Sequence, residues 1–346
     1  MKAVRLYDPL DIRYENIDKA ADPLPGEIRV KVAYAGICGS DIHNYKTGQW
    51  ISRRPSVAGH EFSGWVDAIG DGVEGFALQD KVIADSRYYC SSCANCQSGN
   101  AHLCENLGFI GEAIDGGFAE YVTLPSKLLE KCHPSSRLDI AALAEPLAVA
   151  LHALKRLNIP DDEPLLIIGC GPIGALTAIA SSCQSNRAVL VSDINKEREA
   201  LVAELSNGEG IELASLNQFD NPTAKPLRYV LDTTGNVGVI SNLIAQMNGC
   251  TIGLVGIGAG EFPFDPVHLV ERELTVLGCH AYCDELRDAL SLLEQLPERF
   301  EPVIGTRITL EETPDAYDAI AAGHANGIKT MIVINETLNA VDGTEF

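Results

Sequence analysis

Residues 165–174 read Leu-Leu-Ile-Ile-Gly-Cys-Gly-Pro-Ile-Gly, four apolar residues that run directly into a glycine-rich loop. An apolar helical pattern follows at 172–183, so the loop joins an expected strand to an expected helix. At such a junction, glycines spaced G-x-G-x-x-G let the backbone approach a pyrophosphate at the helix N-terminus. The stretch therefore predicts a dinucleotide site, to which we assign Gly169, Gly171, Pro172, Ile173 and Gly174. The alternative is a glycine-rich turn that binds nothing.

A carboxylate follows the next expected strand at the offset typical of such a site. Asp193 comes directly after the strand at 188–192, about 20 residues beyond the glycine loop, where an acid accepts a hydrogen bond from the adenine ribose. Because a carboxylate there repels a 2′-phosphate, NAD is expected rather than NADP. Arg198 could still reach the adenosine, which leaves NADP as the alternative. We also assign to the cofactor site three residues at the end of a later strand: Val255, Gly256 and Ile257.

Alternation of strands and helices predicts the fold class of the middle of the chain. The expected strands are 165–168, 188–192, 229–232, 251–255 and 274–277, and the expected helices are 172–183, 196–205 and 237–247. Strands separated by helices imply an α/β domain with a doubly wound parallel sheet that is covered on both faces.

The two flanking regions differ from the middle of the chain in composition and in the order of their expected elements. The first third is rich in glycine and proline, with short expected strands at 27–34, 64–69 and 81–84. A helical stretch at 139–157, interrupted by Pro146, leads into the α/β region. After Cys279 the expected elements are a helix at 284–296, a strand at 307–310, a helix at 315–321 and a closing strand at 330–334.

Length and charge restrict the possible functions. The chain has 346 residues, which suggests about two domains. Its 26 Lys and Arg against 48 Asp and Glu give a formal charge of −22, which disfavours the negatively charged nucleic acids and membrane surfaces as partners.

The sequence has no long apolar run, and its start lacks the apolar segment of a signal peptide, so we expect a cytoplasmic protein. Eleven cysteines in such a chain indicate thiols and metal ligands rather than disulfides.

Four of the cysteines are crowded into fifteen residues, in the pattern Cys90-x2-Cys93-x2-Cys96-x7-Cys104. Four thiolates complete the tetrahedral coordination of zinc and leave no open position, which is typical of a structural zinc site. An iron–sulfur cluster also takes four cysteines and is the alternative.

A second candidate metal site is discontinuous in the sequence. Cys38 follows an expected strand, and His60 and Glu61 are adjacent some twenty residues later. One thiolate, one imidazole and one carboxylate leave a fourth position for water or substrate, as catalytic zinc requires. The alternative is a buried cysteine beside an unrelated surface acid. Glu145 interrupts the otherwise apolar run 140–151, and because acids are rarely buried unless paired, it faces either water or a cation.

These motifs together resemble the zinc-dependent medium-chain dehydrogenase/reductases, specifically the polyol branch of sorbitol, xylitol and L-idonate dehydrogenases. In chain order they are GICGSDIH, GHEFSG, the four-cysteine loop, DGGFAEY, AEPLAVALHAL and GCGPIG. The resemblance implies a GroES-like, mostly-β catalytic domain (residues 1–146 and 282–346) split around a Rossmann NAD-binding domain (residues 147–281). It also implies a homodimer or homotetramer.

The resemblance further implies that a hydride passes from a secondary alcohol to NAD⁺, giving a ketone. The catalytic zinc would be held by Cys38, His60 and Glu61, with Glu145 near its bound water, and the four-cysteine loop would hold the structural zinc. Ser40 and His43 would carry the released proton to solvent, because an imidazole titrates near neutrality. Ser40 capping a turn and His43 lying on the surface are the alternatives. Asp41 is a candidate for orienting His60.

The chain departs from the sorbitol dehydrogenase pattern at one position. Where that group usually has Arg-Tyr, this sequence has Ala281-Tyr282. Loss of an arginine that would bind substrate hydroxyls makes a smaller secondary alcohol, such as a vicinal diol, a candidate substrate. Tyr45 and Trp50, in the expected loop between zinc ligands, either line the pocket or are structural. Alternative functions are an L-threonine or butanediol dehydrogenase of the same architecture, a zinc-ribbon binding module, and an inactive member of the family.

Overall fold

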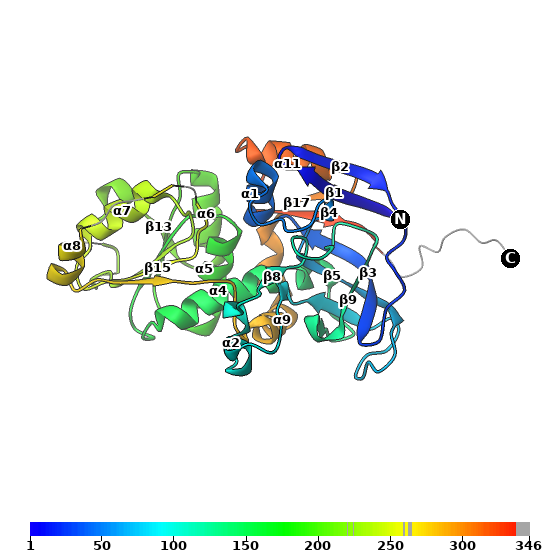
Figure 1. The fold of residues 1–346 in the computed structure, drawn as a ribbon. Helices are drawn as coiled ribbons and strands as arrows, with labels where there is room; N and C mark the ends of the chain where they lie inside the picture. Colours follow the sequence, from blue (N-terminus) through cyan, green and yellow to red (C-terminus); the bar gives the residue numbers. More distant parts are fainter. Residues whose placement is uncertain (220, 224, 259, 262–264, 337–346) are drawn as a thin grey trace. The chain divides into compact units, whose positions relative to one another are not determined.

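The chain folds into two compact units (Figure 1). The first, called the split unit, comprises Met1–Glu145 and Leu286–Phe346, and the second, called the inserted unit, comprises Pro146–Glu285. Each unit has its own sheet and its own buried apolar core. The computed structural model describes residues 1–219, 221–223, 225–258, 260–261 and 265–336.

The inserted unit is built on a six-stranded parallel sheet with the strand order β13-β12-β11-β14-β15-β16. Its strands are β11 (Leu165–Ile168), β12 (Val189–Ser192), β13 (Glu209–Gly210), β14 (Tyr229–Asp232), β15 (Thr251–Leu254) and β16 (Thr275–Gly278). The chain moves outward from β11 to β13, returns to β14, and then moves outward on the other side. The predicted doubly wound sheet is confirmed. Sheets of this kind bind ligands at the carboxyl ends of the two strands where the direction changes, here β11 and β14.

The helices of the inserted unit cover this sheet. They are α4 (Ala144–Leu157), which begins two residues before the unit, α5 (Pro172–Gln184), α6 (Lys196–Leu205), α7 (Val237–Gln246) and α8 (Pro266–Glu271), with a short 3-10 turn at Leu213–Ser215. All four residues of β11 are buried, as expected for a strand covered on both faces. One core cluster joins Leu166 of β11 and Val230 of β14 to Ile240 of α7.

The helical stretch that we expected over 139–157 is two helices. α3 spans Leu138–Ala141, and α4 begins at Ala144. The break therefore comes before Pro146, which is the third residue of α4. A proline is tolerated there because the first amide groups of a helix have no partner within it.

The split unit contains a seven-stranded mixed sheet with the order β10-β6-β5-β3-β18-β17, and β9 also pairs with β3. Its strands are β3 (Glu27–Gly36), β5 (Glu61–Ile69), β6 (Lys81–Ala84), β9 (Tyr121–Pro125), β10 (Leu129–Lys131), β17 (Ile304–Thr309) and β18 (Lys329–Val333). β3 is antiparallel to both β5 and β18, with Gly36 opposite Glu61 on one side and Met331 on the other. This pairing places β18, from the C-terminal part of the chain, directly beside β3.

Smaller elements complete the split unit. A three-stranded sheet is formed by β1 (Lys2–Asp8), β2 (Asp11–Asn16) and β4 (Ser56–Val57), and a two-stranded sheet by β7 (Arg87–Tyr88) and β8 (Gly108–Phe109). The helices are α1 (Gly39–Thr47), α2 (Ala94–Gln97), α3, α9 (Leu286–Gln295), α10 (Pro297–Phe300) and α11 (Thr313–Ala321), with 3-10 turns at Ala101–Leu103, Ser126–Leu128 and Glu301–Val303.

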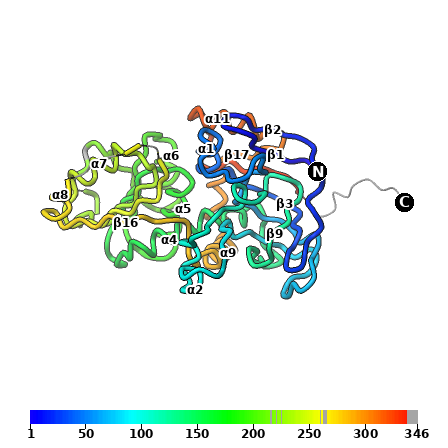
Figure 2. Tube along the Cα trace, viewed as in Figure 1, coloured from blue at the N-terminus to red at the C-terminus, as the bar shows by residue number. Residues whose placement is uncertain are grey.

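Helix α1 occupies a segment that we expected to be a loop. It packs against α11 from the other end of the chain, and Figure 2 shows the two helices side by side. The Tyr45 hydroxyl donates a hydrogen bond to Asp318 Oδ1 at 2.6 Å, across 273 residues of sequence. Lys46 Nζ donates to the carbonyl of Ala321 at 2.8 Å. Tyr45 therefore has a structural role on a helix, and the expectation that it lies in a loop is wrong.

Among the residues that the structure describes, none of the helices combines the length and the apolar character needed to cross a bilayer.

Candidate functional site

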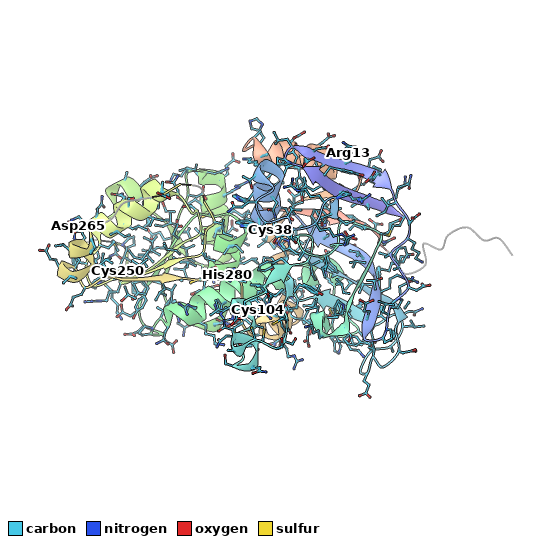
Figure 3. The ribbon with its side chains drawn as sticks, viewed as in Figure 1. Arg13, Cys38, Cys104, Cys250, Asp265 and His280 are labelled. Carbon is cyan, nitrogen blue, oxygen red and sulfur yellow. The ribbon has the colours of Figure 1, made fainter. Side chains whose placement is uncertain are left out.

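Three predicted metal ligands come together at one end of the central sheet in the split unit. Cys38, labelled in Figure 3, is the N-cap of α1, two residues after β3 ends. His60 directly precedes β5, and Glu61 is the first residue of β5. Because β3 and β5 are antiparallel, these segments meet, and one ligand atom of each residue lies within 4.8 Å of the other two.

The His60 imidazole is buried between two residues of α1. Ser40 Oγ lies 3.4 Å from His60 Nε2. Asp41 Oδ1 lies 3.6 Å from His60 Nδ1, and Asp41 Oδ2 accepts a hydrogen bond from the Cys38 amide at 2.9 Å. Burial lowers the pKa of His60, but Asp41 and Cys38 more than offset this and raise it well above its ordinary value.

The donor set fits a bound divalent cation. Cys38, Asp41, Glu61 and Glu145 can all carry negative charge, and the last three are buried. In the part of the chain that the structure describes, the buried His60 Nδ1 atom lacks a hydrogen-bond partner, and the buried Lys329 ammonium pairs with Glu61 Oε2. Buried acids need a compensating cation, and thiolate, imidazole and carboxylate are all zinc ligands. The site is therefore suited to a metal ion with one coordination position left open.

Lys329 is a residue of this site that the sequence analysis missed. Its side chain is 1% exposed, forms an ion pair with Glu61 Oε2, and donates a hydrogen bond to the carbonyl of Ile37 at 2.8 Å. A Cβ atom at Gly36 would collide with Glu61 Oε2 and lie 2.6 Å from Lys329 Cε, so a larger residue there would displace the ends of both side chains. A lysine at the start of an apolar strand is the signal that could have identified Lys329.

Glu145 is buried and belongs to the same electrostatic cluster. Ser86 Oγ donates a hydrogen bond to Glu145 Oε1 at 2.7 Å. Burial raises the pKa of Glu145 to about 7, while His60 partly opposes this shift. The carboxyl group can therefore gain or lose a proton near neutral pH.

The raised pKa of Glu145 predicts a pH-dependent stability. In the unfolded chain this carboxyl ionises near its ordinary pKa, whereas in the folded, metal-free chain it ionises only near 7. Its contribution is therefore fully present below about pH 4.5 and is lost as the pH rises through 7, by on the order of 3 kcal/mol. In urea unfolding, Glu145→Gln should remove this loss between pH 5 and pH 8. Replacement of the exposed Glu298 by Gln is the control, and an unchanged pH dependence in Glu145→Gln would contradict the prediction.

The two predicted proton carriers lie on the same helix in different surroundings. Ser40 is beside His60, as described above. His43 is partly exposed, its Nε2 is 2.8 Å from Gln49 Oε1, and its ring stacks on Trp50 at 4.2 Å. The structure thus places Ser40 beside His60 and leaves His43, in the middle of α1, partly exposed. Their role in proton transfer stays a prediction.

The four clustered cysteines form a second group in the split unit. The Sγ–Sγ separations are 3.5 Å for Cys90 and Cys104, 3.9 Å for Cys93 and Cys104, and 4.0 Å for Cys90 and Cys96. Four sulfurs at about 2.3 Å from one tetrahedral zinc ion are about 3.8 Å apart. Hydrogen bonds from Ser92 lower the pKa of Cys90 to about 5, which favours the thiolate form that binds metal. The spacing suits a single ion better than a larger iron–sulfur cluster.

The predicted glycine loop connects β11 to α5 in the inserted unit. Gly169 has a φ of 98°, and a Cβ atom there would lie 2.5 Å from Thr233 Oγ1. A Cβ atom at Gly174 would collide with the carbonyl oxygen of Gly169, whereas one at Gly171 would meet no atom within 4 Å. Two of the glycines are therefore required by packing, and Gly171 faces open space. Pro172 is the first residue of α5, and Ile173 follows it.

The remaining predicted cofactor residues lie around this loop. Asp193 Oδ2 accepts a hydrogen bond from the Cys170 amide at 2.6 Å, and Asp193 Oδ1 accepts one from the Asn195 amide at 2.7 Å. Val255, Gly256 and Ile257 follow β15, and a Cβ atom at Gly256 would collide with the Gly235 amide. Arg198 is partly buried on α6.

Known proteins resemble the chain over nearly its whole length. Residues 24–134 match the family model of the alcohol dehydrogenase GroES-like domain. Over 335 residues the chain is 33% identical to 2-dehydro-3-deoxy-L-galactonate 5-dehydrogenase of Pseudoalteromonas atlantica, with 91% of this chain and 94% of the relative covered. The chain belongs to the zinc-dependent medium-chain dehydrogenase/reductase family.

Two further members of the medium-chain dehydrogenase/reductases show the same relationship. The chain is 32% identical over 324 residues to L-threonine 3-dehydrogenase of Streptomyces avermitilis, covering 91% of this chain and 93% of the relative. A solved structure described as a zinc-binding dehydrogenase of Sinorhizobium meliloti bound to NADP superposes with a TM-score of 0.87 at 29% identity, covering 96% of this chain and 98% of the other. The expectation of an oxidoreductase of this family is confirmed.

Ala281, where we expect a departure from the sorbitol dehydrogenase pattern, lies near the end of the inserted unit. Ala281 has a φ of 49°, a left-handed conformation that is unusual for alanine. The next residue, Tyr282, is fully buried. The side chain at 281 therefore presents a methyl group where an arginine would present a charged guanidinium group.

Proposed function

We propose that this protein is a zinc-dependent dehydrogenase that transfers a hydride from a secondary alcohol to NAD⁺ and releases a ketone. The substrate class is a polyol, a sugar alcohol or a sugar acid, such as sorbitol, xylitol or L-idonate. The observation that carries the proposal is the convergence of Cys38, His60 and Glu61 within 4.8 Å of one another. An ion held by these three ligands would keep one coordination position available for the substrate oxygen.

The residues around this group have distinct tasks in the proposed reaction. A zinc ion held by Cys38, His60 and Glu61 would lower the pKa of the substrate hydroxyl. Ser40, 3.4 Å from His60 Nε2, accepts the substrate hydroxyl proton as it gives up its own proton toward His43, and the partly exposed His43 releases a proton to solvent. Glu145, which accepts a hydrogen bond from Ser86 Oγ at 2.7 Å, places a buried carboxyl group beside the ligand group.

NAD is the proposed cofactor, held by the loop between β11 and α5. The open face of Gly171 leaves room for the pyrophosphate at the N-terminus of α5. Asp193 lies at the end of β12, tied to the loop through the Cys170 amide, and its carboxylate favours a free ribose hydroxyl over a 2′-phosphate. Because the Sinorhizobium meliloti relative is bound to NADP, a binding test should compare NAD with NADP.

A second zinc ion is proposed at Cys90, Cys93, Cys96 and Cys104, with a structural role. The sulfur separations of 3.5–4.0 Å support a single tetrahedral ion. Elemental analysis should therefore find two zinc ions per chain.

L-Threonine is the second candidate substrate, since its 3-hydroxyl is also a secondary alcohol. Two observations favour it: the 32% identity to an L-threonine 3-dehydrogenase, and the small side chain of Ala281 in place of an arginine that would bind the hydroxyls of a long polyol.

A substrate screen tests the proposed function. NADH formation at 340 nm should be followed with polyols, sugar acids, vicinal diols including 2,3-butanediol, and L-threonine, each with NAD⁺ and with NADP⁺. We expect turnover of at least one secondary alcohol with NAD⁺ and much slower turnover with NADP⁺. No turnover of any secondary alcohol with either dinucleotide would contradict the proposal.

We also propose a cytoplasmic homodimer or homotetramer. All eleven cysteines are free thiols, which is typical of a reducing compartment. β16 is the edge strand of its sheet, and Val276 on β16 and Val270 on α8 are exposed. Exposed edges with apolar side chains are normally covered, here by a second copy of the chain. Light scattering should give a multiple of the chain mass, and a monomeric mass would contradict this assembly.

A further inference from the structure

His43 on α1 is held by two residues of the turn that follows the helix. Its Nε2 atom is 2.8 Å from Gln49 Oε1. Its ring stacks on the Trp50 ring at 4.2 Å between centroids, with 25° between the two planes. A hydrogen bond fixes one atom of an imidazole and stacking fixes its plane. The two contacts together therefore set the orientation of a histidine that is otherwise partly exposed.

The turn that carries Gln49 and Trp50 is itself fastened to α1. The helix ends at Gly48, which has a left-handed φ of 62° and whose amide donates to the Asn44 carbonyl at 2.7 Å. The Trp50 amide donates to Asn44 Oδ1 at 3.1 Å, and the buried Asn44 side chain donates to Glu112 Oε1 at 2.7 Å. The two side chains that contact His43 therefore start from a backbone with a defined position.

The Gln49 contact determines which nitrogen of His43 is free. A carboxamide oxygen only accepts hydrogen bonds, so the nitrogen that faces Gln49 Oε1, Nε2, carries the hydrogen and donates it. In the neutral ring the other nitrogen, Nδ1, then has the lone pair and is the atom that can take up a proton. A ring protonated at Nδ1 still donates from Nε2. The contact with Gln49 is thus kept before and after His43 accepts a proton.

The Trp50 contact favours the protonated ring. A cation within about 6 Å of the face of an aromatic ring is attracted by it, and tryptophan attracts most strongly. The separation of 4.2 Å between the His43 and Trp50 rings lies inside that range. The stack therefore stabilises a positively charged His43 more than a neutral one.

We propose that Gln49 and Trp50 are positioning residues for His43: Gln49 leaves Nδ1 as the proton acceptor, and Trp50 stabilises the ring once it is charged. The inference rests on the proposed function, in which His43 takes the proton that Ser40 gives up. Ser40 and His43 are three residues apart on α1, a spacing that places two side chains on one face of a helix. Release of the accepted proton to water returns the ring to its starting state. Gln49 and Trp50 both act on the reaction through His43.

The first test observes the ring of His43 directly, without substrate. Nitrogen-15 spectra of the histidine-labelled, full-length holoprotein distinguish the two neutral tautomers, and the signals that are missing from His43→Gln belong to His43. We expect the wild type to carry the hydrogen on Nε2. Gln49→Met keeps the length of the side chain but not its acceptor, and should show a mixture of both tautomers.

Gln295→Met is the matched control for this change. Gln295 is also an exposed glutamine that makes one side-chain hydrogen bond, to Ser291 Oγ at 2.8 Å on α9. Its replacement should leave the signals of His43 unchanged. Wild-type signals of His43 in Gln49→Met would overturn the inference.

The second test measures turnover of the best secondary alcohol. Gln49→Met and Trp50→Leu should each lower kcat by about 5-fold, which corresponds to one hydrogen bond of ordinary strength, and leave KM within about 2-fold. Trp50→Phe keeps an aromatic face and should recover most of the rate that Trp50→Leu loses. Added imidazole should restore the rate of both slow variants, because a dissolved base can take the proton in place of His43.

Rescue by imidazole separates positioning from a purely structural role, since a damaged fold would not respond to an added base. Slow variants that imidazole does not restore, or an unchanged kcat in both Gln49→Met and Trp50→Leu, would overturn the inference. A wild type that oxidises no secondary alcohol would instead contradict the proposed function. The tautomer of His43 would still decide whether Gln49 orients the ring.

Discussion

Replacement of Cys38 by serine is expected to lower kcat/KM for the best secondary alcohol by about 10³-fold. Metal polarisation of a substrate oxygen contributes several kcal/mol of transition-state stabilisation, and each 1.36 kcal/mol corresponds to about one factor of ten. The fold should survive, because Cys38 occupies the N-cap of α1 and serine is a favourable residue at that position. Zinc content should fall by one ion per chain.

Cys183→Ser is the matched control for this change. Cys183 lies on α5, is partly buried like Cys38, and belongs to neither group of clustered cysteines. It should keep both zinc ions and full activity. A Cys38→Ser protein that reacts as fast as its parent would show that the ligand group is not the catalytic centre.

Two glycines of the same loop should give opposite results when changed to alanine. Gly174→Ala places a methyl group against the carbonyl of Gly169, and such overpacking should destabilise the fold by about 1–3 kcal/mol. Gly171 has a φ of −72°, which alanine adopts freely, and no atom of the chain within 4 Å of its Cβ position. Gly171→Ala should therefore keep the stability of the fold but weaken NADH binding by at least about 10-fold, because the methyl group occupies the place of the pyrophosphate.

Urea unfolding and fluorescence titration with NADH measure the two effects separately. Gly278→Ala on β16 is the control, since that position also has open space around its Cβ atom and lies outside the loop. Wild-type NADH affinity in Gly171→Ala would mean that the loop does not hold the dinucleotide.

The inserted unit was predicted from sequence because its signals are local. Continuous apolar runs identified β11 and β14 at their observed bounds. The start of α6 coincides with a side-chain cap, where Asn195 accepts from the amides of Glu197 and Arg198. Such signals depend only on residues that are near neighbours in the chain.

The helix α1 was missed for the opposite reason. Asp41 and Asn44 are buried on it although both are polar, so the apolar periodicity by which a helix is recognised is absent. Asp41 makes polar contacts with Cys38 and His60, and Asn44 donates a hydrogen bond to Glu112, so neither side chain packs into an apolar core. Local rules of sequence fail most often at functional sites.

The motifs identified the three candidate ligands, but not the residues that surround them. Lys329 reaches the site through the pairing of β18 with β3. A lysine at the start of an apolar strand marks the position as unusual, but its partner Ile37 is 292 residues away in the chain. Only the three-dimensional structure could therefore show which group the lysine neutralises.

The pairing of β18 with β3 also has a consequence for biosynthesis. Contacts of such long sequence separation form late, because a large loop must close before they are gained. While the ribosome is still translating the inserted unit, Cys38, His60 and Glu61 have already emerged, but the ammonium group that neutralises Glu61 has not yet been made. A nascent chain at that stage therefore lacks the ion pair that Glu61 forms with Lys329 in the folded protein.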